Sequence, residues 1–560
     1  MRFFFLFFPY FAQSIIINTF TPRDIIAVWD TTNVAGIANG TGAWNSNSSL
    51  FTYNGGVNNS PFCQSCNVAF GGGATTGAAG TVTLTGTQRI NSLLFDTTVG
   101  GNYTLTGGTI TCSNSNGCPF TVNQSGTISS VLSGANAIIK NGSQTLTLSG
   151  ANTYSGGTTI SSGTLQTSTV SGAGTGAITL GDANTGASNV SWLFLPGASP
   201  TNNVVVSDQG TGVATIGTYA GAAINTQPNG TLTLNRATTL TDGTGDRTSF
   251  FGKISGNVGT ISIAGSRITF ANAGNDFVGN LSVADGSIYQ SDSSTALPNT
   301  TDITLNGASS FRLNGGGTHA IDALSGSAST SAVNIIAGGN ATLSLGNNNG
   351  SATFNGLISD GAFVLSLIKN GTGTQTLGGA NTFTGSTTVK GGILFFSNAN
   401  SSVGTTSGIT ISDGGQVTLS SGVEGTNYTR PWFFQNTGGS IYMTQPNVAK
   451  NFTISGAITL NGPGSFSGNK AQTTTISGTI SGGGSLTFNT VAGYSNNFNI
   501  TGNNTFTGGT IINANAVVLC GNANAFGTGS VTINNGGTLT KNGCLMTNAI
   551  INNIGGTLNP

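Results

Sequence analysis

Ionisable side chains are rare in this sequence of 560 residues. Lys and Arg number 15 together, Asp and Glu also number 15, and there is one histidine. Charged residues are 5% of the chain, against roughly 25% in an average soluble domain. The net charge is zero and no segment is basic, so the chain lacks the clustered cations that bind a phosphate backbone. We therefore expect no nucleic-acid partner.

Helix-forming surface residues are equally scarce, and no window beyond the first residues keeps a 3.6-residue apolar period. Short runs that alternate hydroxyl and apolar residues occur instead, for example at 81–85, 145–148 and 231–234. Such alternation between Gly and Asn turns predicts short strands. Disorder is not indicated, because 36% of the residues are hydrophobic and the net charge is zero. The sequence predicts an all-β fold.

The polar composition fits one kind of β architecture in particular. In stacked parallel coils each side chain lies about 4.8 Å from its counterpart one coil away. Stacked like charges repel, whereas stacked Asn, Thr, Val and Ile pack closely or form hydrogen-bonded ladders. The 89 glycines, together with Asn, suit sharp corners. We predict an elongated right-handed parallel β-helix, that is, a β-solenoid.

The first residues have the pattern of a secretory signal. Met1 and Arg2 precede an apolar run from Phe3 to Phe11, and Ala12 and Ser14 supply small residues at the positions read by a signal peptidase. A buried first strand or a misplaced start codon are the alternatives. No other stretch approaches the roughly 18 apolar residues that a membrane-spanning helix needs.

Six cysteines fall into two groups. Cys63, Cys66, Cys112 and Cys118 lie near the start, and Cys520 and Cys544 lie near the end, about one predicted coil apart. A zinc site is disfavoured, because the one histidine is remote and thiolate clusters suit reducing compartments. We expect disulfides that staple an N-terminal cap, with three possible connectivities. Stacking by one coil would let Cys520 pair with Cys544, and unpaired buried thiols are the alternative.

One motif occurs four times. Its copies share an asparagine, an aromatic residue two positions later and a glycine two positions after that. The three positions are Asn152, Tyr154 and Gly156; Asn275, Phe277 and Gly279; Asn381, Phe383 and Gly385; and Asn504, Phe506 and Gly508. We interpret the aromatic residue as an inward filler of the solenoid and the glycine as the corner beside it. A ladder of aromatic residues that stack on a ligand is the alternative.

An Ile-Ser element precedes each copy, and its spacing sets the size of the tandem modules. Its isoleucines are Ile128, Ile254, Ile358 and Ile480, at successive spacings of 126, 104 and 122 positions. Each module therefore holds several coils of roughly 20–25 residues. The predicted segments are a signal peptide at 1–14, an N-terminal cap or entry region at 20–125, and modules at 126–249, 250–353, 354–475 and 476–560.

The segment from Leu146 to Leu165 closely resembles the autotransporter-associated β-strand repeat, also called the passenger-associated transport repeat. Three further segments resemble the N-terminal region of such proteins: Val28-Trp29-Asp30, residues 42–45 and residues 91–95. The resemblance covers nearly the whole chain after residue 20, although the copy at 274–288 is degenerate. It implies a β-helical autotransporter passenger, which is adhesin-like in many members.

The same resemblance implies an outer-membrane β-barrel translocator, whose aromatic-flanked strands are absent from this chain. The fourth module begins near Ile480 and reaches Pro560 well short of the length of its siblings. We therefore expect a truncated reading frame or a fragment of a longer protein. The resemblance also places the chain at the cell surface, associated with the outer membrane, or among secreted proteins.

A polysaccharide-active enzyme, lyase or glycosidase, is the first alternative function. Glycoside hydrolysis needs two carboxylates about 5–10 Å apart. The chain has one glutamate, Glu424, and its closest aspartates, Asp242 and Asp246 beside Arg247, lie in a glycine-rich segment typical of turns. His319 and Asp322 are three apart, which on a strand puts them on opposite faces, and we interpret His319 as an exposed loop residue. We predict no catalytic, cofactor-binding or metal-binding residue and no cofactor.

The leading hypothesis is a non-enzymatic passenger, structural or adhesive, that crosses the outer membrane. Its expected partners are host or matrix glycans or proteins, which a polar and weakly charged face would bind through hydrogen bonds. The second alternative is a passive secretion module whose effector portion lies beyond residue 560.

Overall fold

A computed structural model describes residues 26–31, 39–45, 47, 49–53, 59–71, 78–97, 100–219, 225–243, 247–397, 403, 405–420, 426–444 and 451–560. The predicted signal peptide at 1–14 lies outside them. The chain divides into two compact units, residues 1–159 with 171–176 and residues 160–170 with 177–560, here unit 1 and unit 2. Every regular element in the described residues is a β-strand. None of their segments forms an apolar helix that could cross a bilayer.

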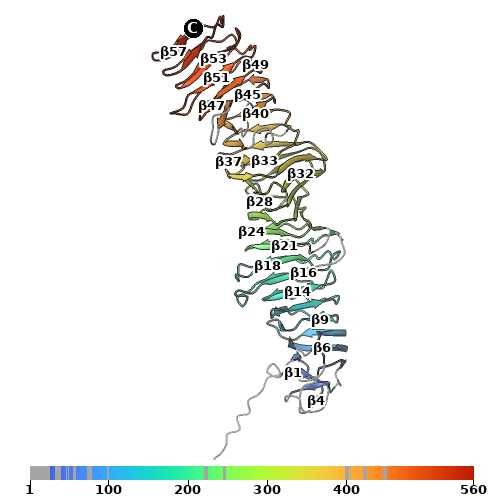
Figure 1. Cartoon of the computed structure of the whole chain (residues 1–560). Coiled ribbons are helices and arrows are strands. Elements are labelled where there is room, and N and C mark those ends of the chain that lie inside the picture. Colours follow the sequence, from blue (N-terminus) through green and yellow to red (C-terminus); the bar gives the residue numbers. More distant parts are fainter. Residues whose placement is uncertain are drawn as a thin grey trace, which may run out of the picture. The chain divides into compact units, whose positions relative to one another are not determined.

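Unit 1 begins with a small entry region and continues as stacked parallel coils (Figure 1). Its strands are β1 (Ile26–Trp29), β2 (Gly42–Trp44), β3 (Phe51–Thr52), β4 (Asn59–Ser60), β5 (Cys66–Phe70), β6 (Thr81–Phe95), β7 (Tyr103–Cys112), β8 (Cys118–Val122), β9 (Gly126–Ile128), β10 (Val131–Ser133), β11 (Ile138–Asn141) and β12 (Thr145–Leu148). β13 (Thr158–Ile160) lies across the division between the units.

Three series of parallel strands make the faces of unit 1. One runs β1–β5–β6–β8–β11, another runs β2–β6–β7–β9–β12, and the third runs β6–β7–β10, with the long strand β6 in all three. Only the short strand β3 pairs antiparallel, with β1 and β4, among the described strands. Beneath it Trp29, Trp44, Phe51, Phe62 and Phe70 are buried, with ring centroids 4.9 to 5.8 Å apart. These rings close the core at the first coil.

The first coils of unit 2 have three faces, each a parallel series. The first comprises β14 (Gly163–Thr167), β16 (Val190–Phe194), β18 (Ala214–Thr218), β21 (Thr238–Thr241), β24 (Asn257–Ala264), β26 (Val278–Val283), β28 (Ile303–Leu305) and β31 (Leu324–Ser325). The second comprises β15 (Ile178–Leu180), β17 (Val204–Val206), β20 (Leu232–Leu234) and β23 (Ile254–Ser255). The third comprises β19 (Asn225–Thr226), β22 (Arg247–Phe250), β25 (Ile268–Phe270), β27 (Ile288–Ser291), β29 (Ser310–Asn314), β32 (Ala332–Ala337) and β35 (Leu357–Gly361).

The later coils of unit 2 again have three parallel faces. One holds β30 (Gly317–Ala320), β33 (Ala341–Leu345), β36 (Leu365–Lys369), β38 (Thr387–Val389), β40 (Ile409–Ser412), β43 (Trp432–Gln435), β46 (Ile458–Leu460) and β49 (Ile480–Gly482). Another holds β34 (Ala352–Phe354), β37 (Thr374–Leu377), β39 (Ile393–Phe396), β41 (Gly415–Ser420), β44 (Gly439–Thr444), β47 (Gly464–Gly468), β50 (Leu486–Phe488), β52 (Thr510–Ile512), β54 (Val531–Ile533) and β56 (Ile550–Asn552). The last holds β42 (Thr426–Tyr428), β45 (Phe452–Ile454), β48 (Thr473–Ile476), β51 (Asn496–Ile500), β53 (Ala516–Cys520), β55 (Thr538–Thr540) and β57 (Thr557–Asn559).

The alternation seen in the sequence is the alternation between core and surface. In β48, for example, Thr474 and Ile476 are buried while Thr473 and Thr475 face outward. Inward side chains stack on their counterparts one coil away, as Phe466 does on Phe488 with ring centroids 6.2 Å apart. Each such buried apolar side chain stabilises the coil by about 1.5–3 kcal/mol relative to exposure. The predicted all-β parallel solenoid is confirmed.

Coil length varies along unit 2. The coil from Val531 to its pairing partner Ile550 contains fewer residues than the coil from Val204 to its pairing partner Leu232. Corners absorb the difference, because a loop at a corner can lengthen without moving the strands that it joins. The predicted module boundaries stay predictions.

Candidate functional site

The repeated asparagine joins three consecutive coils. Its side-chain oxygen accepts the backbone N–H of the preceding coil, and its amide donates to a carbonyl of the following coil. The pairs are Leu132 N and Gly172 O for Asn152 (2.8 and 2.6 Å), Ile254 N and Ala296 O for Asn275 (2.8 and 2.8 Å), and Ile480 N and Ala525 O for Asn504 (2.7 and 2.6 Å). In the remaining copy Asn381 accepts from Ile358 N at 2.9 Å. All four asparagines are buried, so each satisfies backbone groups that water cannot reach.

The aromatic residue and the glycine of the motif take the predicted positions. Tyr154, Phe277, Phe383 and Phe506 are no more than 1% exposed, so they fill the core and are not available to stack on a ligand. A Cβ at Gly508 would lie 2.3 Å from the backbone carbon of Gly484, one coil away. Glycine at this position therefore allows the two coils to approach.

The element that precedes the motif differs from expectation in the first copy. Leu132, and not Ile128, donates to the asparagine there, so Leu132-Ser133-Gly134 corresponds to Ile254-Ser255-Gly256. The donor precedes its asparagine by 20 residues in this copy and by 21 to 24 in the others. Ile128 stands as far before Asn152 as Ile480, the donor of the fourth copy, stands before Asn504. The spacing in the sequence alone therefore favoured Ile128, which is not the donor.

Two lysines that the sequence reasoning did not single out are buried in the coils. Lys140 and Lys369 are 0% exposed and stand in the same sequence, Ile-Lys-Asn-Gly. Lys140 Nζ donates to the carbonyls of Asn141 and Gly142 at 3.0 and 2.7 Å, and Lys369 donates to Asn370 O and Gly371 O. Burial lowers the pKa of Lys369 and lowers that of Lys140 from 10.5 to about 7. The recurrence of this tetrapeptide was the feature of the sequence that could have drawn attention to the two lysines.

Lys140 gives a testable pH dependence. Between pH 7 and its ordinary pKa the unfolded chain binds a proton that the folded chain does not, so stability rises with pH. We expect the free energy of unfolding of unit 1 to increase by about 2 kcal/mol from pH 6.5 to 8.5. Lys140→Met should remove this increase, whereas Lys390→Met, at an exposed lysine, should keep it. Denaturant titrations across the pH range measure both, and equal slopes in the wild type and Lys140→Met would contradict the assignment.

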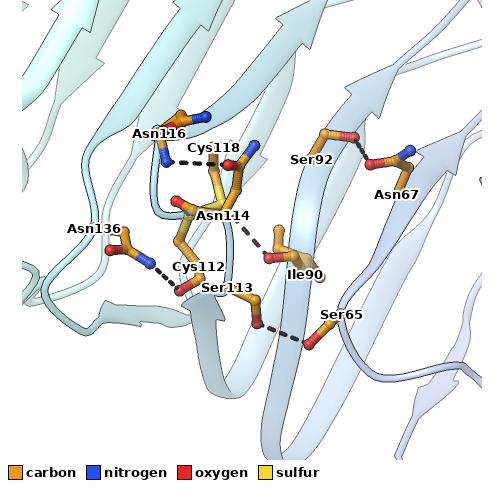
Figure 2. The surroundings of a disulfide bond; sticks show 10 residues. All are labelled: Ser65, Asn67, Ile90, Ser92, Cys112, Ser113, Asn114, Asn116, Cys118 and Asn136. Carbon is orange, nitrogen blue, oxygen red and sulfur yellow. Dashed lines mark hydrogen bonds between the residues drawn. A yellow bond between two sulfur atoms is a disulfide. The ribbon is translucent and has the colours of Figure 1, made fainter. Parts of the chain in front are cut away.

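All six cysteines are paired. The disulfides are Cys63–Cys66, Cys112–Cys118 and Cys520–Cys544, with Cα atoms 5.7, 5.8 and 6.0 Å apart. This confirms the expected disulfides and selects the local connectivity for the first four. Figure 2 shows the Cys112–Cys118 loop beside β6, where Asn136 Nδ2 donates to Cys112 O at 3.0 Å.

Asp242, the one of the three candidate carboxylates that lies in the described residues, binds backbone groups of the adjacent coil. Asp242 is buried, its two oxygens accept Ser266 N and Arg267 N at 2.6 Å, and burial raises its pKa. Asp246 and Glu424 lie outside the described residues. Within the described part of the chain no three His, Cys, Asp or Glu side chains gather around a possible metal position.

The expectation that His319 is an exposed loop residue was wrong. His319 lies in β30, is 2% exposed, and its Nε2 lies 3.0 Å from Gly315 O. Burial lowers the pKa of His319, so the imidazole is uncharged at neutral pH. Its side chain fills an inward-facing position of the coil. Asp322 is also buried, and its Oδ1 accepts Asn348 N and Gly350 N at 2.7 and 2.8 Å. The glycines before His319 suggested a solvent loop, but they make the corner that leads into an inward-facing position.

The outer faces carry long columns of hydroxyl side chains in register. In unit 1 the column is Thr81, Thr104, Thr127 and Thr147. In unit 2 it is Thr164, Ser191, Thr215, Thr239, Ser262, Ser282, Thr304 and Ser325. Further along unit 2 lies a ladder of asparagines: Asn513 Nδ2 donates to Asn489 Oδ1, Asn534 Nδ2 to Asn513 Oδ1 and Asn553 Nδ2 to Asn534 Oδ1, each at 2.7 Å. These faces offer donors and acceptors with almost no charge.

Stacked parallel coils, an asparagine that bridges them and uncharged polar faces describe a parallel β-solenoid. The passenger-associated-transport-repeat family matches residues 138–167 and 367–394, which include both buried lysines and the first and third motif copies. These matches bear out the resemblance to passenger repeats that the sequence indicated. The adhesin BmaC autotransporter of Brucella suis biovar 1 (strain 1330) is 32% identical over 253 residues, which is 43% of this chain and 7% of that relative. The chain thus spans a small part of that relative's length. No solved structure matches the chain.

Proposed function

We propose that the chain is a non-enzymatic adhesive passenger that acts at the cell surface or after secretion. The observation that carries the proposal is the outward face of unit 2, where eight successive coils present Thr or Ser at the same position. A row of hydroxyls with about 4.8 Å between members can bond repeatedly to an extended polar partner. The similarity to a protein named an adhesin supports the same conclusion.

The test is retention of chain-coated beads on surfaces. Beads that carry the purified full chain are washed over cultured mammalian cells and over immobilised matrix proteins and glycans. We expect retention well above that of beads coated with albumin. A variant with Thr215, Thr239 and Ser262 all changed to Asp should lose most of it, because each change removes a hydroxyl donor and adjacent carboxylates repel one another. Retention of the wild type no greater than that of albumin would contradict the proposal.

The enzymatic alternative has its own test. Asp242 is committed to backbone N–H groups of the adjacent coil. We therefore propose that the chain releases no reducing ends or unsaturated sugars from pectin, alginate or hyaluronan. Release that Asp242→Asn abolishes would overturn this part of the proposal.

A further inference from the structure

A cavity of about 480 Å³ opens on the outer face of unit 1. It lies over four stacked strands, β1, β5, β6 and β8, which pair in that order. Its size is within the range of about 300–1,000 Å³ that small-molecule sites occupy. The polar side chains that line it are Asn67, Asn91, Ser92, Asn114, Thr121 and Asn123.

The lining has the chemistry of a site for a neutral, hydroxyl-rich ligand. An amide can donate and accept, and a hydroxyl can do either. Part of this capacity is used within the protein, since Ser92 Oγ donates to Asn67 Oδ1 and Asn123 Nδ2 donates to Asp96 Oδ1 at 3.3 Å. No ionisable side chain itself lines the cavity within the described residues. Ile26, Leu94 and Pro119 supply apolar surface between the polar groups. A sugar ring presents the same combination, because its hydroxyls surround an apolar face of C–H groups.

Part of the site is held in place before any ligand arrives. Ser92 Oγ donates to Asn67 Oδ1 at 2.8 Å, which fixes two adjacent side chains on β5 and β6. Asn114 lies in the loop that Cys112–Cys118 closes, and its Oδ1 accepts Asn116 N at 3.1 Å (Figure 2). A binding group that is already ordered loses little conformational entropy when a ligand binds.

The backbone of this face is not available to a peptide strand. β5 pairs with β1 and β6, β6 pairs with β8, and β8 pairs with β11. An extended peptide that binds by adding a strand needs a free sheet edge. Recognition in the cavity must therefore come from side chains, and these side chains are amides and hydroxyls.

We propose that this cavity binds a neutral saccharide unit. The inference deepens the proposed adhesive function and rests on it, because it assigns a ligand class and a location to the adhesive surface. Asn67, Ser92 and Asn114 form the hydrogen-bonding wall, and Leu94 with Pro119 packs against the sugar ring.

The test uses the full chain and measures saturation-transfer NMR with lactose, chitobiose, maltose and methyl α-mannoside. A capped tetrapeptide of Ala and Ser and 3′-sialyllactose are comparators. We expect at least one neutral saccharide to bind. Thr121→Arg fills the cavity, and Asn114→Leu removes one amide; each should weaken binding at least about tenfold, the equivalent of about 1.4 kcal/mol. Thr85→Arg is the matched control, because Thr85 is exposed, does not line the cavity and is not in the hydroxyl column of unit 1, and it should bind as the wild type does.

Three results would overturn the inference: no neutral saccharide binds, only the peptide or the sialylated sugar binds, or both cavity variants bind as well as Thr85→Arg. Thermal melting of each variant separates a lost site from a lost fold. The bead assay distinguishes this failure from failure of the proposed function. If the beads adhere but no saccharide binds, the adhesive function remains supported and the cavity is not its ligand site. If a saccharide binds but the beads do not adhere, the cavity is a saccharide site and the adhesive function is contradicted.

Discussion

Replacing Asn504 by leucine is expected to destabilise unit 2 by about 2–5 kcal/mol, because the substitution leaves two buried backbone groups without partners. Asn504 accepts from Ile480 N at 2.7 Å and donates to Ala525 O at 2.6 Å. Ile480 and Ala525 are both 0% exposed, so water cannot replace the lost amide. Leucine has a similar size, so the effect measures hydrogen bonding and not a cavity.

Asn503→Leu is the control, because Asn503 is the exposed neighbour in the same motif. Surface substitutions of this kind change stability by about 0.5 kcal/mol or less. Urea titration gives the free energy of unfolding, and hydrogen exchange at the Ile480 amide reports the local effect. Equal stability of the two variants would show that the repeated asparagine does not hold the coils together.

Gly508→Ala is expected to cost about 3 kcal/mol, although it adds one methyl group. The new Cβ would lie 2.3 Å from Gly484 C and 2.4 Å from the carbonyl oxygens of Gly483 and Gly484. These are backbone atoms of the adjacent coil, which cannot move aside as the end of a side chain does. Overpacking costs about 1–3 kcal/mol where neighbours can adjust, and this position is at the upper end of that range.

The adjacent coil provides a matched control for Gly508→Ala. A Cβ at Gly483 would meet nothing within 4 Å, and the residue does not have a positive φ. Gly483→Ala should therefore leave stability unchanged or increase it by about 0.4–1 kcal/mol, since alanine reduces the freedom of the unfolded chain. Thermal unfolding of both variants measures the difference. If Gly508→Ala is as stable as Gly483→Ala, close coil contact is not the reason for the repeated glycine.

Sequence reasoning predicted the features that repeat. Period-two alternation gave the strands, and the four motif copies gave the inward positions of Tyr154 and Phe506. Both follow from local physics, because alternation decides which side chains face the core and glycine decides where coils can touch. The role of the asparagine could not be derived this way, since its partners lie 20 to 24 residues away on both sides.

Features that depend on stacking register were beyond the sequence. Leu132 took the place expected for Ile128 because the interval from the donor to the asparagine is shorter in this copy of the motif than in the other three. His319 turned inward because of the corner before it. The cavity in unit 1 exists only when segments near residues 26, 67, 92 and 120 lie side by side. No local pattern specifies that juxtaposition, although all of its residues are visible in the sequence.

The asparagine that binds the coil before it and the coil after it has a consequence for how such a gene can change in length. Leu132, Ile254, Ile358 and Ile480 mark equivalent points in successive copies of the motif. Unequal recombination between two copies of the motif removes or adds a whole number of coils, and it rebuilds the same three-coil bridge at the junction. A break elsewhere leaves an asparagine facing the wrong coil. Selection for folding alone would therefore let allelic lengths differ in module-sized steps and eliminate those with partial coils.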